Sequence, residues 1–409
     1  MTDYRGLLER LHQASIAAVG GRSAVARALN EGQVPSGPLQ VVAVGKAAAA
    51  MLHGAVDVRG DDIAASLLIT REGYEDAQLS GRLAVEVYTA PHPVPDQRSL
   101  IAGDQLVRFI EQAPVDAQFL FLISGGASSL VERLAGQADA TALAALNAQL
   151  LASGRDIGQM NQLRKAVSTI KGGRLARWLQ GRRADVLLIS DVPGDDPAVI
   201  GSGLLFADHN PLHANAAAQQ LPAGLIPADP APWPDDPCFE TIHAQIVASN
   251  AMALSAAQQA AQAEGWAVTS HPGSLNGEAA LLGPRLADSL LNGSAGITLW
   301  GGEPTVSLPD NPGRGGRMQA LALAAAQALQ GSDAVLLAAG TDGADGPGEE
   351  AGAVVDGATI DRGEAKHWSA DQALNTADAG GFLQASGDLL RTGATGTNVM
   401  DIVIGLKPH

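Results

Sequence analysis

The sequence predicts an α/β protein of two domains, each with a mostly parallel sheet between layers of helices (an α/β/α arrangement). Its 409 residues exceed what one hydrophobic core usually serves, so two domains are expected. Apolar runs of strand length alternate with helical patterns along the chain. These runs are continuous rather than alternating in polarity, as is typical of parallel strands that are covered on both faces.

Five apolar runs are the clearest predicted strands, and each ends in glycine or a polar turn. They cover residues 39–45, 118–126, 184–192, 295–303 and 333–343. The first of them, LQVVAVG, is followed by the helix-like KAAAAMLHGAV. Because ligands of such sheets bind beyond the carboxyl ends of the strands, the glycines and carboxylates at these ends indicate where a site lies.

A proline-rich stretch separates the two predicted domains. Residues 221–237, LPAGLIPADPAPWPDDP, contain six prolines, which fix the backbone and remove hydrogen-bond donors. We therefore predict an amino-terminal domain over 1–225, a linker over 226–238 and a carboxyl-terminal domain over 239–409. The sequence leaves open whether the helix within residues 1–30 packs on its own domain or on the second one.

Charge and cysteine content narrow the class of protein. The net charge of −17 argues against non-specific nucleic-acid binding, which needs a basic surface, and against an anionic membrane. The single cysteine, Cys238, allows no internal disulfide and fits a reducing compartment. No apolar run resembles a membrane span, and the start, MTDYRGLLERLHQ, does not resemble a signal peptide. We expect a cytoplasmic protein that acts on small molecules as a monomer or homodimer.

Basic residues gather in one part of this acidic chain. Residues 155–183 hold eight of the 26 basic side chains and one acid, Asp156. At helical spacing, Arg164, Ser168 and Lys171 fall on one polar face. Because acids are missing as partners in this stretch, we predict an anion-binding site, with a solvated helix face as the alternative.

Two more cations and a serine-rich turn follow predicted strands. Lys46 directly follows the strand VVAVG, where the backbone N–H groups of a helix start favour an anion. Arg317 lies in GRGGRMQAL, where glycines again open a helix. The segment ISGGASSL, residues 123–130, ends a strand with glycines and small hydroxyl groups that could hold a phosphate or carboxylate. Helix capping by serine is the alternative interpretation of this segment.

Carboxylates also follow strand ends. They are Asp191, Glu303, Asp342 and Asp345. Oxygen ligands on loops, close to cations and glycine turns, suit Mg²⁺ that bridges phosphates. The last two lie in AAGTDGADGPGEEAGAVVDG, residues 338–357, where we interpret Glu349 and Glu350 as solvated loop residues.

Standard nucleotide-binding motifs are missing from the sequence. AVGKAAAAM lacks the spacing of a Walker A motif and the Ser/Thr after its lysine. GPGEEA, residues 346–351, matches the dinucleotide fingerprint formally, but it places two glutamates where a pyrophosphate would dock. The sequence therefore offers no acceptable nicotinamide site.

Nine motifs occur in the order that is typical of class II glycerate kinases, and the sequence resembles this family from about residue 5 to 406. The motifs are VVAVGKAAAAM, PHPVPD, LISGGASSL, NQLRKAVSTIKGGRLA, LLISDVPGDDPAVIGSG, WGGEPTV, GGRMQALALAAAQAL, AAGTDGADGPGEEAGAVVDGAT and TGATGTNVMDIVIGL. The family comprises glycerate 2-kinases with a carboxyl-terminal MOFRL domain, under older labels hydroxypyruvate reductase. The resemblance implies an active site in the cleft between two α/β domains. It also implies ATP-dependent phosphorylation of D-glycerate at its 2-hydroxyl to 2-phosphoglycerate.

The implied reaction gives roles to the predicted site residues. Lys46 and Arg317 are expected to clamp phosphates, and Asp191 to orient or deprotonate the glycerate hydroxyl. The expected substrate and phosphate cradle consists of Ser124, Gly125, Gly126, Ser128, Asn161, Arg164 and Lys171. The carboxylates expected to hold Mg²⁺ beside ATP are Asp342, Asp345 and Glu303.

Some positions depart from the family pattern. Met318 and Ala320 replace a polar pair beside Arg317, and Met400 replaces an asparagine. Because of Met318 and Ala320, a kinase that acts on a related small hydroxy acid remains an alternative. An NAD(P)H-dependent hydroxypyruvate reductase and a non-catalytic sugar-phosphate-binding module also stay open.

Overall fold

The computed structural model describes residues 3–32, 34–153 and 157–408, which form two units. The first unit, Gly21–Val247, is built on a six-stranded sheet of order β3-β2-β1-β4-β5-β6. Its strands are β1 Leu39–Val44, β2 Ile63–Arg71, β3 Val85–Ala90, β4 Gln118–Ile123, β5 Ala184–Ile189 and β6 Ile242–Ala248. The pairs β1–β2, β1–β4, β2–β3 and β4–β5 are parallel. The α/β class and the mostly parallel sheet predicted for this part of the chain are confirmed.

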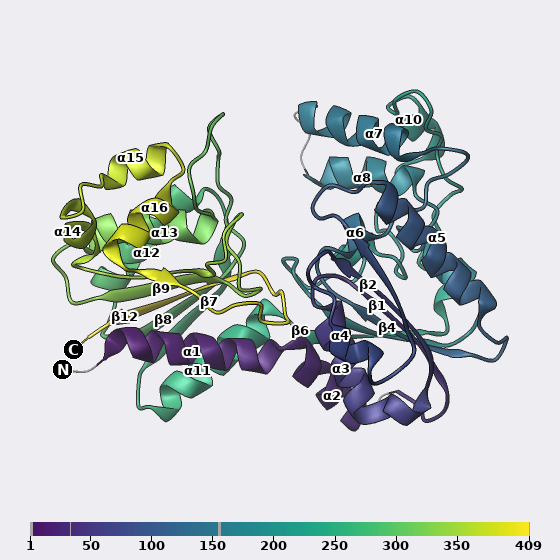
Figure 1. Cartoon of the computed structure of the whole chain (residues 1–409), viewed down its shortest axis with the longest axis horizontal. Helices are drawn as coiled ribbons and strands as arrows, with labels where there is room; N and C mark the ends of the chain where they lie inside the picture. The colour runs from purple at the N-terminus through teal and green to yellow at the C-terminus, as the bar shows by residue number, and fades with distance from the viewer. Residues whose placement is uncertain (1–2, 33, 154–156, 409) are drawn as a thin grey trace. The chain divides into compact units, whose positions relative to one another are not determined.

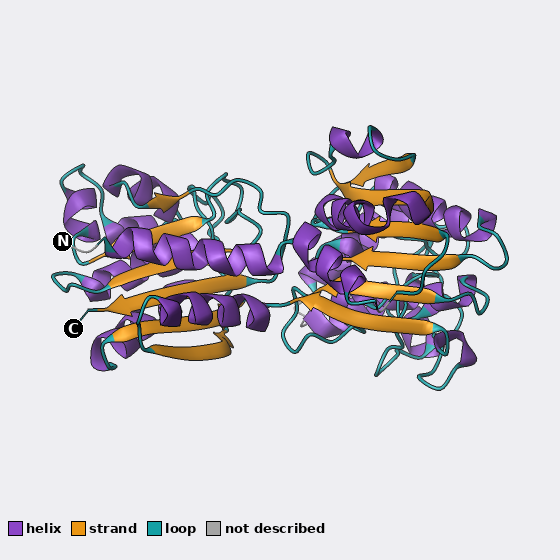
Figure 2. Ribbon diagram, turned by 90° about the horizontal axis from the view of Figure 1, so that it is seen from below, coloured by secondary structure: helices purple, strands orange, loops and turns teal. Residues whose placement is uncertain are grey.

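Helices cover this sheet, as Figure 2 shows. They are α2 Gly21–Asn30, α3 Ala48–Arg59, α4 Ala77–Ser80, α5 Gln97–Gln112, α6 Ala127–Leu130, α7 Ala140–Ala152, α8 Ile157–Val167, α9 Arg174–Trp178 and α10 Ala214–Ala218. Short 3₁₀ turns lie at η1 Gly60–Asp62, η2 Ile200–Ser202 and η3 Pro237–Phe239. Strands β1 and β5 are buried along their whole length, which agrees with the continuous apolar runs seen in the sequence.

Helices α7, α8 and α10 lie together at one end of the first unit (Figure 1). Helix α7 begins where the Asp139 side chain accepts a hydrogen bond from the Ala142 N–H group. Leu146 and Leu150 of α7 and Leu163 of α8 belong to an apolar cluster that is separate from the main core of the sheet. These helices therefore form a small additional layer, and the cavity described below lies beneath it.

The second unit combines residues 1–20 with Ala248–His409, and its sheet is mixed. The strand order is β11-β10-β9-β12-β8-β7. The strands are β7 Val268–Leu275, β8 Gly296–Gly302, β9 Val335–Gly340, β10 Gly352–Asp356, β11 Leu389–Leu390 and β12 Asp401–Lys407. Only β7–β8 is a parallel pair among the described ones, so the mostly parallel arrangement predicted for this domain needs correction. The cause is β12, which inserts antiparallel between β8 and β9, and β10, which follows β9 without a helical crossover.

Helix α1 belongs to this second unit, whereas α2 belongs to the first. The helices here are α1 Tyr4–Val19, α11 Asn250–Ala263, α12 Ala279–Asn292, α13 Arg317–Leu329, α14 Thr359–Glu364, α15 Ala370–Asn375 and α16 Ala379–Ser386. Helix α1 lies beside α11 (Figure 1), and Arg5 donates to Asp356 and to the Val354 carbonyl. The predicted helical region 1–30 is thus divided between the two units. No helix within the described ranges has both the length and the apolar character needed to cross a membrane.

The proline-rich residues predicted as a linker over 226–238 lie within the first unit, since the units divide after Val247. Strand β6 follows these residues and joins the first sheet. The Arg174 and Arg177 side chains donate to the carbonyl oxygens of Asp229 and Pro230 at 2.8 and 2.9 Å. Hydrogen bonds to these two arginines therefore hold the proline-rich stretch against the first unit.

The buried histidine of α1 predicts a pH dependence of stability. His12 is 1% exposed, its Nε2 atom has no hydrogen-bond partner in the protein, and burial lowers its pKa to about 4. Above pH 6.5 the imidazole is neutral in both the folded and the unfolded chain. Between pH 6.5 and 4 only the unfolded chain binds the proton, so the free energy of unfolding falls as the pH falls. From pH 7 to 5 this loss amounts to about 2 kcal/mol.

Urea unfolding of the wild type, His12→Leu and His243→Leu at both pH values tests this expectation. Between pH 7 and pH 5, the free energy of unfolding of the His12 variant should fall by about 2 kcal/mol less than that of the wild type. The variant of the exposed His243 should behave like the wild type. An equal pH dependence in all three proteins contradicts the assignment.

Candidate functional site

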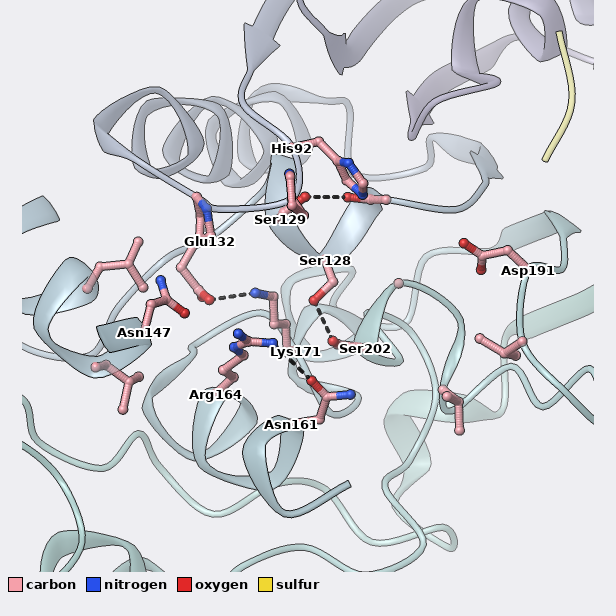
Figure 3. Close-up of a pocket in the computed structure, with 18 residues that line it drawn as sticks. His92, Ser128, Ser129, Glu132, Asn147, Asn161, Arg164, Lys171, Asp191 and Ser202 are labelled. Carbon is pink, nitrogen blue, oxygen red and sulfur yellow. Dashed lines mark hydrogen bonds and ion pairs between the residues drawn. The ribbon is translucent and has the colours of Figure 1, made fainter. Parts of the chain in front are cut away.

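A cavity of about 230 Å³ lies in the first unit at the carboxyl ends of its strands. His92 follows β3, Gly126 and Ser128 follow β4, and Asp191 follows β5. The opposite wall comes from α7 and α8 and from the turns around Lys171 and Ser202. The labelled lining residues in Figure 3 are His92, Ser128, Ser129, Glu132, Asn147, Asn161, Arg164, Lys171, Asp191 and Ser202. Most of the predicted cradle is therefore brought together around one space.

Lys46 lies next to this cavity, between β1 and α3. Its backbone N–H group donates to the Gly125 carbonyl at 2.9 Å, and the residue is half-buried. A Cβ atom on Gly126, whose φ is +83°, would lie 3.3 Å from Lys46 Cγ and 3.0 Å from the His92 ring. Glycine at 126 thus permits both side chains to approach the turn after β4.

Ser124 and Gly125, predicted as anion ligands, lie behind the cavity wall. Ser124 is fully buried, and its hydroxyl oxygen accepts a hydrogen bond from the Ala47 N–H group at 3.0 Å. The Gly125 carbonyl accepts from Lys46, as described above. We assign these two residues to tying the loop after β4 to the loop after β1, which positions Lys46. Ser128 does line the cavity, where its hydroxyl lies 2.6 Å from that of Ser202.

The cationic end of the cavity is arranged differently from the predicted helix face. Helix α8 ends at Val167, and Lys171 lies beyond a turn in which the Ser168 hydroxyl accepts from the Lys171 N–H group. The Lys171 Nζ atom lies 2.5 Å from Glu132 Oε2, and both side chains are 2% exposed. Sequence reasoning missed Glu132, although an acid inside the apolar segment SSLVERLA was a signal. The Lys171 charge is therefore balanced by a buried carboxylate.

Acidic partners for other cations of this stretch also come from elsewhere in the chain. Lys165 pairs with Asp208 at 3.1 Å, and Arg183 pairs with Asp185 at 2.8 Å. The prediction that these cations lack acidic partners is wrong, because the partners lie outside the stretch 155–183. Two members of the stretch, Arg155 and Asp156, lie outside the described residues.

Arg164, another cation of the cavity, has a side-chain donor that no group in the protein uses. Its Nη1 atom donates to Asn161 Oδ1 at 3.4 Å, while its buried Nε atom has no partner in the protein. Burial lowers the pKa of the Arg164 guanidinium, and the charge of Glu132 opposes this effect. A guanidinium remains protonated even so, and it therefore presents a positive charge and an unpaired donor to a bound anion.

The buried Glu132–Lys171 pair supports a stability prediction. Glu132→Gln is expected to lower the free energy of unfolding by about 3 kcal/mol, because it leaves the lysine charge buried without its partner. Glu132→Gln combined with Lys171→Met should recover most of this loss. Urea unfolding measures both variants, and the exposed Glu86→Gln serves as the control. A loss below about 1 kcal/mol in the single variant contradicts this role.

In the second unit, Arg317 lies at the start of α13 between two carboxylates. Its Nε and Nη2 atoms lie 2.6 and 3.2 Å from the two Asp401 oxygens, and its Nη1 atom lies 2.8 Å from Glu303 Oε1. Burial alone would lower the pKa of Arg317, but the charges of Asp401 and Glu303 outweigh burial and raise it. Burial raises the pKa of Asp401 to about 7, against the opposing effect of Arg317. The guanidinium is therefore held in one orientation.

Asp401 is a residue that sequence reasoning missed. It closes the motif TNVMD and begins β12, so an acid at the start of a buried apolar strand was the available signal. Its side chain is 3% exposed. A buried acid at such a position needs a partner, and Arg317 is that partner.

The three predicted Mg²⁺ ligands differ in what they contact. Both oxygens of Asp345 accept backbone hydrogen bonds at the start of α13, from Met318 at 3.0 Å and Gln319 at 2.7 Å. We therefore assign Asp345 to capping this helix. Glu303 pairs with Arg317, whereas half-buried Asp342 accepts from the Ala344 N–H group with Oδ1. Within the described residues, no group of three or more acidic, histidine or cysteine side chains is arranged to hold a metal.

One expectation about a loop residue near Arg317 also needs correction. Glu350 is 3% exposed and pairs with Arg314 and Arg391, so it is a buried ion-pair partner rather than a solvated residue. Met318 is fully buried and packs in the apolar core of this unit. The methionine at this position therefore contributes to the core.

Comparisons with known proteins give consistent results. The family described as a domain of unknown function, DUF4147, matches residues 7–222, and the MOFRL family matches residues 296–401. The chain is 37% identical to a putative hydroxypyruvate reductase of Agrobacterium vitis, over 97% of this chain and 93% of the relative. It is 33% identical to the D-glycerate 2-kinase of Thermotoga maritima, over 90% of each chain. The crystal structure of a glycerate kinase from Thermotoga maritima superimposes with a TM-score of 0.86 at 31% identity, over 98% of this chain and 99% of that one.

Proposed function

We propose a function from one established premise: this chain belongs to the class II glycerate kinase family, whose members carry a MOFRL domain. The proposed reaction is the ATP-dependent phosphorylation of D-glycerate at its 2-hydroxyl, which gives 2-phosphoglycerate and ADP. One observation in particular supports it. The cavity at the carboxyl edge of the first sheet places Arg164 with an unpaired donor at one side and Asp191 at the other (Figure 3). This arrangement suits a small acid that also carries a hydroxyl group.

The first unit supplies groups for both ends of such an acid. Arg164 binds the carboxylate in this proposal, because a guanidinium suits carboxylate geometry. Asp191 orients the 2-hydroxyl or accepts its proton. Lys46, anchored on the Gly125 carbonyl, contributes a positive charge to the phosphoryl group during transfer. Phosphoryl transfer needs positioning and charge neutralisation more than covalent chemistry, and these residues supply both.

The second unit contributes Arg317 to the nucleotide phosphates in this proposal. Its guanidinium is oriented by Asp401 and Glu303, so little rotamer freedom is lost when a phosphate binds. Of the three predicted metal ligands, we retain Asp342, whose half-buried side chain lies two residues beyond the end of β9. Mg²⁺ bound with ATP would neutralise charge on the phosphates.

We also propose that the enzyme works in the cytoplasm as a monomer or homodimer, with neither nucleic acid nor membrane as a partner. The net charge of −17 and the single cysteine support this proposal. Size-exclusion chromatography coupled to light scattering measures the oligomeric state.

A panel of small acids tests the reaction. ADP release with Mg-ATP is measured for D-glycerate, D-lactate, glycolate and hydroxypyruvate, and phosphorus NMR identifies the phosphorylated oxygen. We expect D-glycerate to be preferred and 2-phosphoglycerate to be the product. ADP release with none of the acids contradicts the kinase proposal. Oxidation of NADH or NADPH with hydroxypyruvate in the absence of ATP would support the reductase alternative.

A further inference from the structure

The cavity wall contains a buried amide whose polar atoms have no hydrogen-bond partner within the protein. Asn147 of α7 is 4% exposed, and neither its Oδ1 nor its Nδ2 atom has a hydrogen-bond partner in the protein. Among the described residues that line this cavity, Asn147 and Arg164 are those with a buried side-chain nitrogen or oxygen atom that has no hydrogen-bond partner. Asparagine is also unfavourable in the middle of a helix, and its neighbours here are alanine and leucine. A buried, unpaired amide is costly, so its presence in the cavity wall indicates a ligand group that pairs with it.

The two unpaired groups are chemically different. The Arg164 Nε atom only donates and carries positive charge, so it matches a carboxylate. The Asn147 amide both donates and accepts, so it matches a hydroxyl group, which accepts from Nδ2 and donates to Oδ1. A carboxylate at the amide would leave Oδ1 facing a negatively charged oxygen. Either orientation of the amide gives the same conclusion, because the donor and the acceptor are both unpaired.

Glu132 and Lys171 already pair with each other, and the α7 residues Leu143 and Leu146 contribute apolar surface to the cavity. Figure 3 shows Asn147 and Arg164 on one side of the cavity and Asp191 on the opposite side. A ligand held at the first side therefore extends its remaining polar group toward Asp191.

We propose that Asn147 binds the terminal hydroxyl, on C3, of the hydroxy acid whose carboxylate binds Arg164. This inference rests on the proposed function, and it makes Asn147 the residue that selects glycerate over acids without that hydroxyl. With the carboxylate and C3 hydroxyl both fixed, the reacting 2-hydroxyl of only one enantiomer is directed toward Asp191. Binding at three separate points thus accounts for stereospecificity as well as substrate choice.

Asn147→Leu tests the proposal, because leucine is similar in size and lacks both polar atoms. Values of kcat/KM are measured for D-glycerate and D-lactate, which differ in the C3 hydroxyl. Calorimetry with the same two acids, without nucleotide, measures binding independently of turnover. We expect the ratio of kcat/KM for glycerate to kcat/KM for lactate to fall by about tenfold or more, mainly because kcat/KM for glycerate falls. Gln149→Leu, an exposed amide on the same helix, is the control and should keep the wild-type preference.

The stability of the variant separates binding from a structural role. Because the amide is unpaired within the protein, Asn147→Leu should retain or raise the thermal midpoint. Asn147→Ala provides a second variant if leucine does not fit. An unchanged preference in a folded variant overturns the proposal, and so does a wild type that binds neither acid. If the wild type binds glycerate without releasing ADP, the proposed function fails, and the calorimetric preference still decides the role of Asn147.

Discussion

Lys46→Ala is expected to lower kcat for glycerate phosphorylation by about 10³-fold while leaving the fold and thermal midpoint unchanged. The lysine lies at the turn between β1 and α3, and its backbone is held by the Gly125 carbonyl. Its side chain lies close to Gly126, which is part of the cavity wall. A cation at this place neutralises charge on a transferring phosphoryl group, and proteins accelerate such reactions mainly by neutralising charge and positioning the reactants. Unlike Lys171, Lys46 is only half-buried, so its removal should leave stability unaffected.

Steady-state kinetics with Mg-ATP and glycerate, together with thermal unfolding, measure this effect. Lys366→Ala removes an exposed lysine and should retain wild-type kcat. Lys46→Arg keeps the charge but changes its geometry and should recover part of the activity. Turnover within about tenfold of the wild type in Lys46→Ala would remove this residue from the mechanism.

The cavity residues that follow strands could be predicted because a parallel sheet gathers its strand ends at one edge. Gly126, Ser128 and Asp191 each follow an apolar run that the sequence makes plain. Asn147 and Glu132 could not be predicted in this way. One lies on a helix of the layer above the sheet, and the other follows the short helix α6. Hydrophobic periodicity identifies the buried face of a helix, but it does not say whether a cavity or a core lies beneath it.

In the second unit, the strand order and the partners of the site residues could not be predicted from the sequence, for a related reason. Strand β12 is contributed by the end of the chain and inserts between β8 and β9, which adjacent sequence elements do not indicate. This strand begins with Asp401, so the partner that orients Arg317 comes from 84 residues away. Loop carboxylates look alike in a sequence, and for this reason the sequence predicts a metal ligand at Asp345. Its function as a cap for α13 depends on which helix start lies beside the loop.

Arg317→Met is expected to reduce both activity and stability, for two different reasons. Loss of the guanidinium should lower kcat by about 10³-fold, because the charge that stabilises the nucleotide phosphates is removed. It also leaves the Asp401 carboxylate buried without its partner, which should lower the free energy of unfolding by about 3 kcal/mol. Glu303→Gln is the matched control: this carboxylate is exposed, so its loss should cost less than about 1 kcal/mol.

Combining Arg317→Met with Asp401→Asn separates the two effects. The double variant has no unpaired charge, so most of the lost stability should return, and urea unfolding measures this recovery. Turnover should stay at the level of the single variant, because a neutral pair cannot stabilise phosphate charge. If kcat recovers together with stability, the contribution of Arg317 is to the fold alone. If stability recovers and turnover does not, Arg317 acts on the reaction itself, and Asp401 positions the guanidinium that does so.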